Sequence, residues 1–131
     1  MPAQILVRDE TFSGQALQEL RFEVQNERLT VRELIRQRVH QEVSLYNLSQ
    51  PGYFRGLVQP SDAEATLNGY RLRQRRQIDW EQQAEQALLA FERNGFFILV
   101  GDHQAESLDE VIEIGEDTTV TFLKLVPLVG G

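Results

Sequence analysis

The segment 17–25 alternates apolar and polar residues and leads almost directly into the start of an amphipathic helix. Leu20, Phe22 and Val24 are apolar, and a polar residue lies between each pair. Such alternation is typical of a strand that buries one face. Thr30 and Glu33 then have the spacing of a capping box, the signature of a helix N-terminus. A strand and a helix that each have one apolar face, and that are this close in sequence, can bury these faces against each other. We therefore expect an α+β fold.

The neighbouring segments extend this pattern to a hairpin covered by a helix. Residues 4–11 favour a strand, and the turn chemistry of 12–15 predicts that it pairs with 17–25. We expect 26–28 to be a turn and the helix to end near Asn47, before Pro51 and Gly52. One stripe of this helix is apolar and should cover the hairpin. The stripe comprises Val31, Leu34, Ile35, Val39, Val43 and Tyr46.

The middle of the chain is predicted to be an insertion, at about 48–95, that packs against this unit. Glycine, proline and asparagine divide 48–78 into short pieces, but its aromatic content is too high for a disordered linker. The segment 61–64 could cap a short helix that ends at 68–69. Asp79 should cap a second, clearer helix that ends at Asn94 and Gly95.

The last third of the chain has the features of strands. The continuous apolar run 96–100 predicts a strand inside the sheet, 108–114 a short edge strand, and 118–126 the final strand. The first and last strands can lie parallel and side by side in the centre. In the final strand Val120 and Phe122 favour one face, while Leu123 and Leu125 favour the other. That second face is either a docking surface or the place where the inserted helix packs.

Composition limits the possible functions. A chain of 131 residues suits one domain, and with no cysteine it has no disulfide, thiolate metal site or catalytic thiol. Its net charge of −7 makes nucleic acid unlikely as the main ligand. No apolar run approaches the length of a membrane span, so we expect a cytoplasmic protein. The single lysine, Lys124, and the N-terminus are the possible acceptor amines.

Several polar groups have side chains that could form a binding site. His40 and His103 lack partners at metal-ligand spacing, and the acidic residues between 106 and 117 lack the central glycine of a calcium loop. A solvated acidic face is the favoured interpretation of the latter. The arginines of 71–76 could contact RNA or phosphate, but pairing with carboxylates of this chain or of a partner is favoured. No catalytic motif is found, so we expect a substrate or carrier rather than an enzyme, with no bound cofactor and no metal.

The C-terminal segment carries a family resemblance. Residues 123–131 read Leu-Lys-Leu-Val-Pro-Leu-Val-Gly-Gly and follow the final predicted strand. This segment, with the helix start at 29–34, resembles the ubiquitin-like β-grasp superfamily, including its modifiers and the small bacterial sulfur carriers. The resemblance covers roughly 1–47 and 95–131. Glycines at a chain end are also typical of a frayed terminus.

The resemblance implies a bacterial-type ubiquitin-like domain over 1–131 with an exposed tail at about 127–131. An E1-like adenylating enzyme would use ATP to activate the carboxylate of Gly131, reached through Gly130. An E2-like conjugating enzyme and a deconjugating protease are possible further partners, and target proteins would be modified on amines. The residues expected to serve tail and partner docking are Pro127, Leu128, Val129, Leu123 and Leu125. Sulfur transfer through a C-terminal thiocarboxylate and non-covalent protein binding remain as alternatives.

Overall fold

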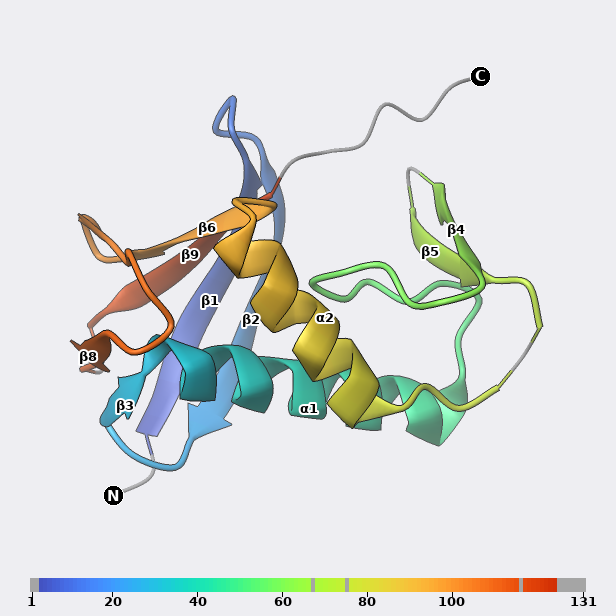
Figure 1. Ribbon diagram of the computed structural model, residues 1–131, viewed down its shortest axis with the longest axis horizontal. Helices are drawn as coiled ribbons and strands as arrows, with labels where there is room; N and C mark the ends of the chain where they lie inside the picture. Colours follow the sequence, from blue (N-terminus) through green and yellow to red (C-terminus); the bar gives the residue numbers. More distant parts are fainter. Residues whose placement is uncertain (1–2, 67, 75, 116, 125–131) are drawn as a thin grey trace.

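In a computed structural model, which describes residues 3–66, 68–74, 76–115 and 117–124, the chain forms an α+β fold with a mixed sheet (Figure 1). The described sheet has the strand order β2-β1-β9-β6-β7. Its strands are β1 (Ala3–Thr11), β2 (Ala16–Val24), β6 (Phe96–Val100), β7 (His103–Gln104) and β9 (Thr119–Lys124). In the described part of the chain the helices are α1 (Val31–Ser49) and α2 (Trp80–Glu92).

The first and last strands lie side by side in the centre of the sheet. β1 pairs with β2 antiparallel and with β9 parallel, and Val7 lies opposite Val120. β9 continues antiparallel against β6, where Phe122 lies opposite Ile98. The predicted hairpin and the predicted parallel pairing are confirmed. The final strand is therefore held on both sides.

Helix α1 begins where the capping box predicts. The Thr30 hydroxyl oxygen accepts the Glu33 N–H at 3.1 Å, and the predicted apolar stripe is buried. The helix continues to Ser49, two residues past the expected end. Gln50 then adopts a left-handed conformation, with φ of 43°, and its N–H donates to Tyr46 O. That hydrogen bond closes the last turn, and the helix ends before Pro51 and Gly52 as predicted.

The expected turn at 26–28 and the expected edge strand at 108–114 need correction. β3 (Arg28–Thr30) pairs antiparallel with β8 (Val111–Glu113) in a separate two-stranded sheet. The first N–H groups of a helix have no partner within the helix. Here Val31 N–H donates to Glu110 O and Arg32 N–H to Leu108 O. These bonds draw 108–113 to the start of α1 instead of to the main sheet.

The short helix expected at 61–69 is wrong, because this segment is a hairpin. β4 (Ala63–Thr66) pairs antiparallel with β5 (Gly69–Leu72). Phe54 and Tyr70 exchange two main-chain hydrogen bonds of 2.7 and 2.8 Å, so β5 is paired on its other side as well. Extended pairing satisfies more main-chain groups here than one helical turn would. We call residues 50–78, which include this hairpin, the lobe.

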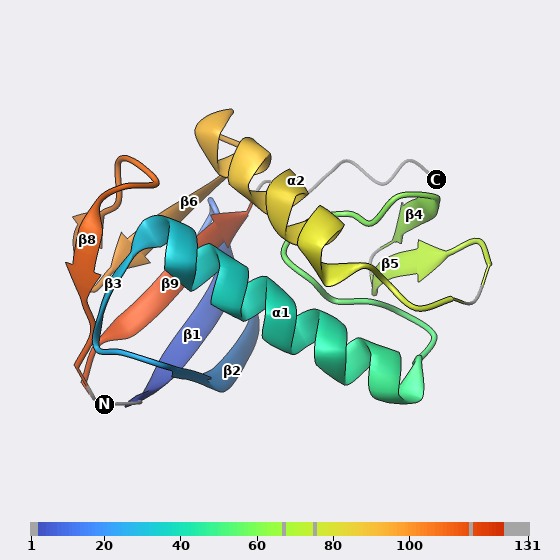
Figure 2. The same cartoon turned by 60° about the horizontal axis from the view of Figure 1, so that its bottom comes forward.

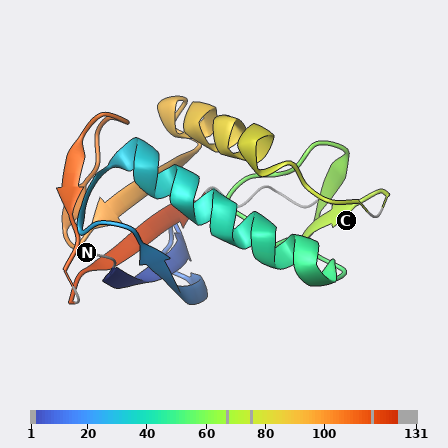
Figure 3. The ribbon, with the colours of Figure 1, turned by 90° about the horizontal axis from the view of Figure 1, so that it is seen from below.

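Both helices lie on the same face of the sheet (Figures 2 and 3). α2 starts at its predicted cap, Asp79, whose carboxylate accepts the Glu81 N–H at 3.0 Å. Phe91 on α2 contacts Phe96 on β6, and Phe96 contacts Phe122 on β9, with ring centroids 5.9 and 6.0 Å apart. The inserted helix therefore packs on the face that carries Val120 and Phe122. No helix in the described ranges is long and apolar enough to cross a membrane.

Candidate functional site

The described part of the candidate site is the end of β9 and its surroundings. Lys124 ends the strand, opposite Thr11 on β1 and Phe96 on β6. The remaining predicted tail residues lie outside the described residues: Leu125, Pro127, Leu128, Val129, Gly130 and Gly131. The site is therefore built from Leu123, Lys124 and the elements that contact them.

The side chain of Lys124 connects β9 to the lobe. Its Nζ donates to the main-chain carbonyl of Gly56 at 3.0 Å. Burial lowers the pKa of the Lys124 amine, and the positive charge of Arg38 lowers it further, whereas Asp9 acts in the opposite direction. The predicted acceptor amine is thus held by a carbonyl of its own chain. Its use as an acceptor would require this hydrogen bond to break.

A buried ionic cluster lies directly beneath this contact. Arg38 on α1 donates from Nη1 and Nη2 to the two carboxylate oxygens of Asp9 on β1, at 2.6 and 2.7 Å. Its Nε donates to Glu42 at 3.2 Å. Burial alone would raise the pKa of Asp9, but the charge and hydrogen bonds of Arg38 reverse this, and the pKa is lowered. For Glu42, burial dominates and raises the pKa despite Arg38.

The same cluster fixes the lobe to the sheet. Glu42 Oε1 accepts the Leu57 N–H at 2.9 Å. Gln18 Nε2 donates both to Asp9, at 2.7 Å, and to the carbonyl of Arg55, at 3.2 Å. Two strands, one helix and the lobe therefore meet within a few residues of the end of β9. Any partner that approaches this end also meets the lobe.

Two sequence signals for this cluster were missed. Arg38 falls on the apolar stripe of α1, between Ile35 and Val39. Asp9 continues the inward positions of β1 after Ile5 and Val7, and both cluster residues are fully or almost fully buried. A cation on a helix stripe and a carboxylate on a strand face are each costly to bury alone. Taken together they predict a buried pair.

The opposite face of the sheet carries an apolar group near the end of β9. Leu123 lies between Glu10 on β1 and Phe97 on β6. Phe97 contacts Phe12, from the β1–β2 turn, edge to face with centroids 5.4 Å apart. Phe12 is 52% exposed. Among the described residues, both helices lie on the other face of the sheet and neither covers this group.

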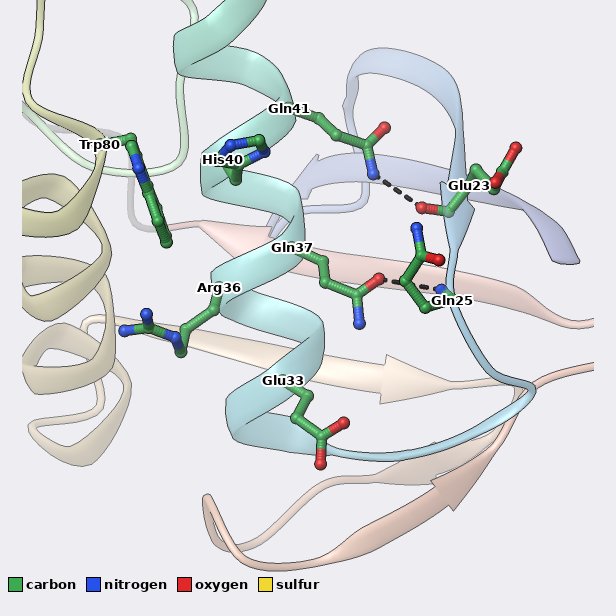
Figure 4. A pocket seen from close by; sticks show the side chains of 8 residues that line it. All are labelled: Glu23, Gln25, Glu33, Arg36, Gln37, His40, Gln41 and Trp80. Atoms are coloured by element: carbon green, nitrogen blue, oxygen red, sulfur yellow. Dashed lines mark hydrogen bonds between the residues drawn. The ribbon is translucent and has the colours of Figure 1, made fainter. Parts of the chain in front are cut away.

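A hollow of about 460 Å³ lies between β2, α1 and the start of α2 (Figure 4). Gln41 Nε2 donates to Glu23 O at 2.7 Å, and Gln37 Oε1 accepts the Gln25 N–H at 3.2 Å. These two glutamines satisfy one main-chain group near the end of β2, at Glu23, and one directly after the strand, at Gln25. The far wall is formed by Trp80, against which His40 stacks edge on at 4.7 Å and Arg36 lies at 5.2 Å.

The other polar candidates lie apart from this site. His103 Nε2 is 2.6 Å from Glu110, near β8. Of the predicted arginine patch, Arg71 lies on β5, and Arg73 and Arg76 lie in the segment after it, where Arg73 is 3.8 Å from Asp62. Arg75 lies outside the described residues. In the described part of the chain no group of three His, Asp or Glu side chains is arranged to hold a metal ion.

No protein-family model, curated protein or solved structure matches the chain. Its function is therefore inferred from the fold and from the residues around the end of β9.

Proposed function

We propose that the chain is a ubiquitin-like β-grasp protein whose Gly131 carboxylate is adenylated by a partner enzyme and then joined to amines of target proteins. The proposal is supported by the hairpin-then-helix order and by the strand order β2-β1-β9-β6-β7, with the last strand in the middle. The resemblance of 123–131 to modifier tails supports the proposed activation of the Gly131 carboxylate. The lobe would then be an addition to the minimal fold.

The observation that carries the proposal is the parallel pairing of β9 with β1. It fixes Lys124 beside Thr11 at the C-terminal ends of the two central strands, seven residues before Gly131. Seven residues span at most about 24 Å when fully extended. A carboxylate with that maximum reach would suit an active site deep inside a partner.

The proposed chemistry runs in three steps. The Gly131 carboxylate attacks the α-phosphorus of ATP, pyrophosphate leaves, and an acyl-adenylate forms. A cysteine thiolate then displaces AMP and gives a thioester. This thiolate belongs to a partner, because this chain has no cysteine. A target amine attacks the thioester and releases the thiol. Glycines at 130 and 131 allow the chain to enter a narrow channel in conformations that other residues resist.

The sheet face that neither described helix covers would supply a docking surface at the end of β9. Phe12, Phe97 and Leu123 form an apolar group there, and clustered exposed apolar side chains often mark a protein interaction site. This observation also favours the second candidate function, non-covalent protein binding. In that case the tail would have no chemical role.

The test is incubation of the purified protein with candidate activating enzymes and ATP, followed by intact mass measurement with and without reductant. The proposal expects a thiol-sensitive enzyme adduct that is absent from a variant lacking Gly131. In the native cell, covalent adducts with other proteins support conjugation, whereas one oxygen-to-sulfur exchange supports sulfur carriage instead. If the variant lacking Gly131 works as well as the full chain in the cell, the carboxylate has no role and the proposal is wrong.

A further inference from the structure

The charges of this protein are separated along its length. Residues 50–78, the lobe, contain five arginines and two carboxylates, a net charge of +3. The total of −7 therefore leaves −10 for the remainder of the chain. The lobe is therefore a basic region in an otherwise acidic protein.

The basic lobe and one group of exposed carboxylates lie at opposite ends of the molecule. Figures 1 and 2 place the β4–β5 hairpin at one end of the long axis and the β3–β8 sheet at the other. At the β3–β8 end the exposed side chains include Glu106, Asp109 and Glu113. Arg32 lies 3.4 Å from Asp109 but is itself largely exposed, so this contact is weak. We call this the acidic end.

Two arginines of the lobe are exposed and lie on a firmly attached support, whereas Arg76 is half-buried and donates to the main-chain carbonyl of Ser61. Arg71 and Arg73 lie on and directly after β5, and both are exposed. Within the described residues, the Arg73 side chain makes one long contact, to Asp62, with both side chains in solvent. The lobe beneath them is held by the paired hydrogen bonds of Phe54 and Tyr70 and by the Glu42–Leu57 bond. The positive charges are thus presented on a fixed surface.

We propose that the lobe of one copy docks on the acidic end of a second copy, so that copies associate head to tail. Arginine recognises carboxylates through two parallel hydrogen bonds, and the acidic end offers several carboxylates. The net charge of −10 elsewhere repels nucleic acid. It also repels a second copy, but at physiological ionic strength this repulsion is screened beyond about 8 Å, and the touching ends dominate. A head-to-tail contact uses two different surfaces and therefore propagates.

The first test is sedimentation velocity of the full chain over a range of concentrations. At about 0.1 M salt the weight-average mass should rise with protein concentration. At about 1 M salt, where the screening length falls to about 3 Å, it should return to the mass of a single copy. The variants R71E/R73E and E106K/E113K should each remain single copies. The control R21E/R93E changes the net charge as much as R71E/R73E does, but at exposed positions outside both surfaces, and should associate like the unmodified chain.

Two further samples separate a lost contact from a lost fold. A mixture of R71E/R73E and E106K/E113K should form pairs and nothing larger, because each variant keeps one working surface. A chain with all four substitutions has both signs exchanged and should associate again. The proposal is overturned if the unmodified chain stays a single copy at every concentration, if R21E/R93E behaves like the end variants, or if the four-substitution chain stays single. Tight binding of a single-stranded RNA that is lost in R71E/R73E would instead assign the lobe to nucleic acid and also overturn it.

Discussion

Asp9 on β1 and Arg38 on α1 form a bidentate ion pair in the interior, with both side chains almost completely shielded from solvent. Arg38 also lies over the face of Phe122, 4.4 Å from the ring centroid. The Arg38 guanidinium therefore joins the helix to the hairpin, through Asp9, and to the final strand, through Phe122. This pair therefore fixes the position of α1 relative to the sheet.

Removing one partner of this pair should destabilise the fold strongly. We expect Asp9→Asn and Arg38→Met each to lower the free energy of unfolding by about 3 kcal/mol or more, because the remaining charge stays buried without its partner. The double variant should lose less than the sum, by about 2 kcal/mol. Urea unfolding followed by Trp80 fluorescence measures all three.

The exposed pair Arg32 and Asp109 is the control for this cycle. Its members are 3.4 Å apart at the surface. Their coupling should stay below about 1 kcal/mol. Equal coupling in the two pairs would show that burial does not set the energy of the Asp9–Arg38 contact.

The cluster also predicts a pH dependence whose sign differs between its two carboxylates. The pKa of Asp9 is lowered in the folded state, so its contribution is present above the unfolded value of about 3.9 and is lost as the pH falls through the folded pKa. The pKa of Glu42 is raised, so its contribution declines as the pH rises from about 4.3 through the folded pKa. Unfolding free energies measured between about pH 2 and 8 test both signs.

In these measurements Asp9→Asn should differ most from the unmodified chain at neutral pH and approach it in acid. Glu42→Gln keeps an oxygen for the Leu57 N–H, and should remove the decline above about pH 4.3. A Glu42→Gln profile parallel to that of the unmodified chain over this range would contradict the assigned sign.

Much of the fold could be predicted because its signals are local. The alternation of 17–25, the cap at Thr30 and the cap at Asp79 each act within a few residues, and each predicted element is present. The parallel pairing of the first and last strands also followed, from their apolar content and positions in the chain. The strands and helix starts depend on side chains that are neighbours in sequence, whereas this pairing follows from the order of the elements along the chain.

The elements that were predicted wrongly depend on distant partners. The 61–69 segment is a hairpin because Tyr70 bonds to Phe54, sixteen residues away. The 108–113 segment leaves the main sheet because its carbonyls accept hydrogen bonds from the start of α1. Neither partner is visible in a local pattern. The contact between Lys124 and Gly56 was hidden for the same reason.

Gly56 should tolerate no side chain. A Cβ at this position would run into the ring of Phe54, which is buried and packs edge to face against Tyr46 at 5.4 Å. We expect Gly56→Ala to lower the free energy of unfolding by about 1–3 kcal/mol. Gly52→Ala is the matched control in the same lobe, because a Cβ there meets nothing within 4 Å, and it should be close to neutral. Equal losses in the two variants would contradict a packing cause.

The last prediction concerns the reactivity of the only lysine. Lys124 Nζ is held by the Gly56 carbonyl, and burial lowers its pKa. The low pKa favours the reactive neutral amine, but the hydrogen bond and burial block the approach of a reagent. We expect an amine-directed acylating reagent to label the native chain first at the N-terminus and to label Lys124 at least about tenfold more slowly than in denaturant, a factor that corresponds to about 1.4 kcal/mol. Peptide mapping by mass spectrometry measures both rates. Gly56→Ala, which disturbs the carbonyl that holds the amine, should speed the labelling of Lys124 without changing that of the N-terminus, and rapid labelling of native Lys124 would show that the amine is free to act as an acceptor.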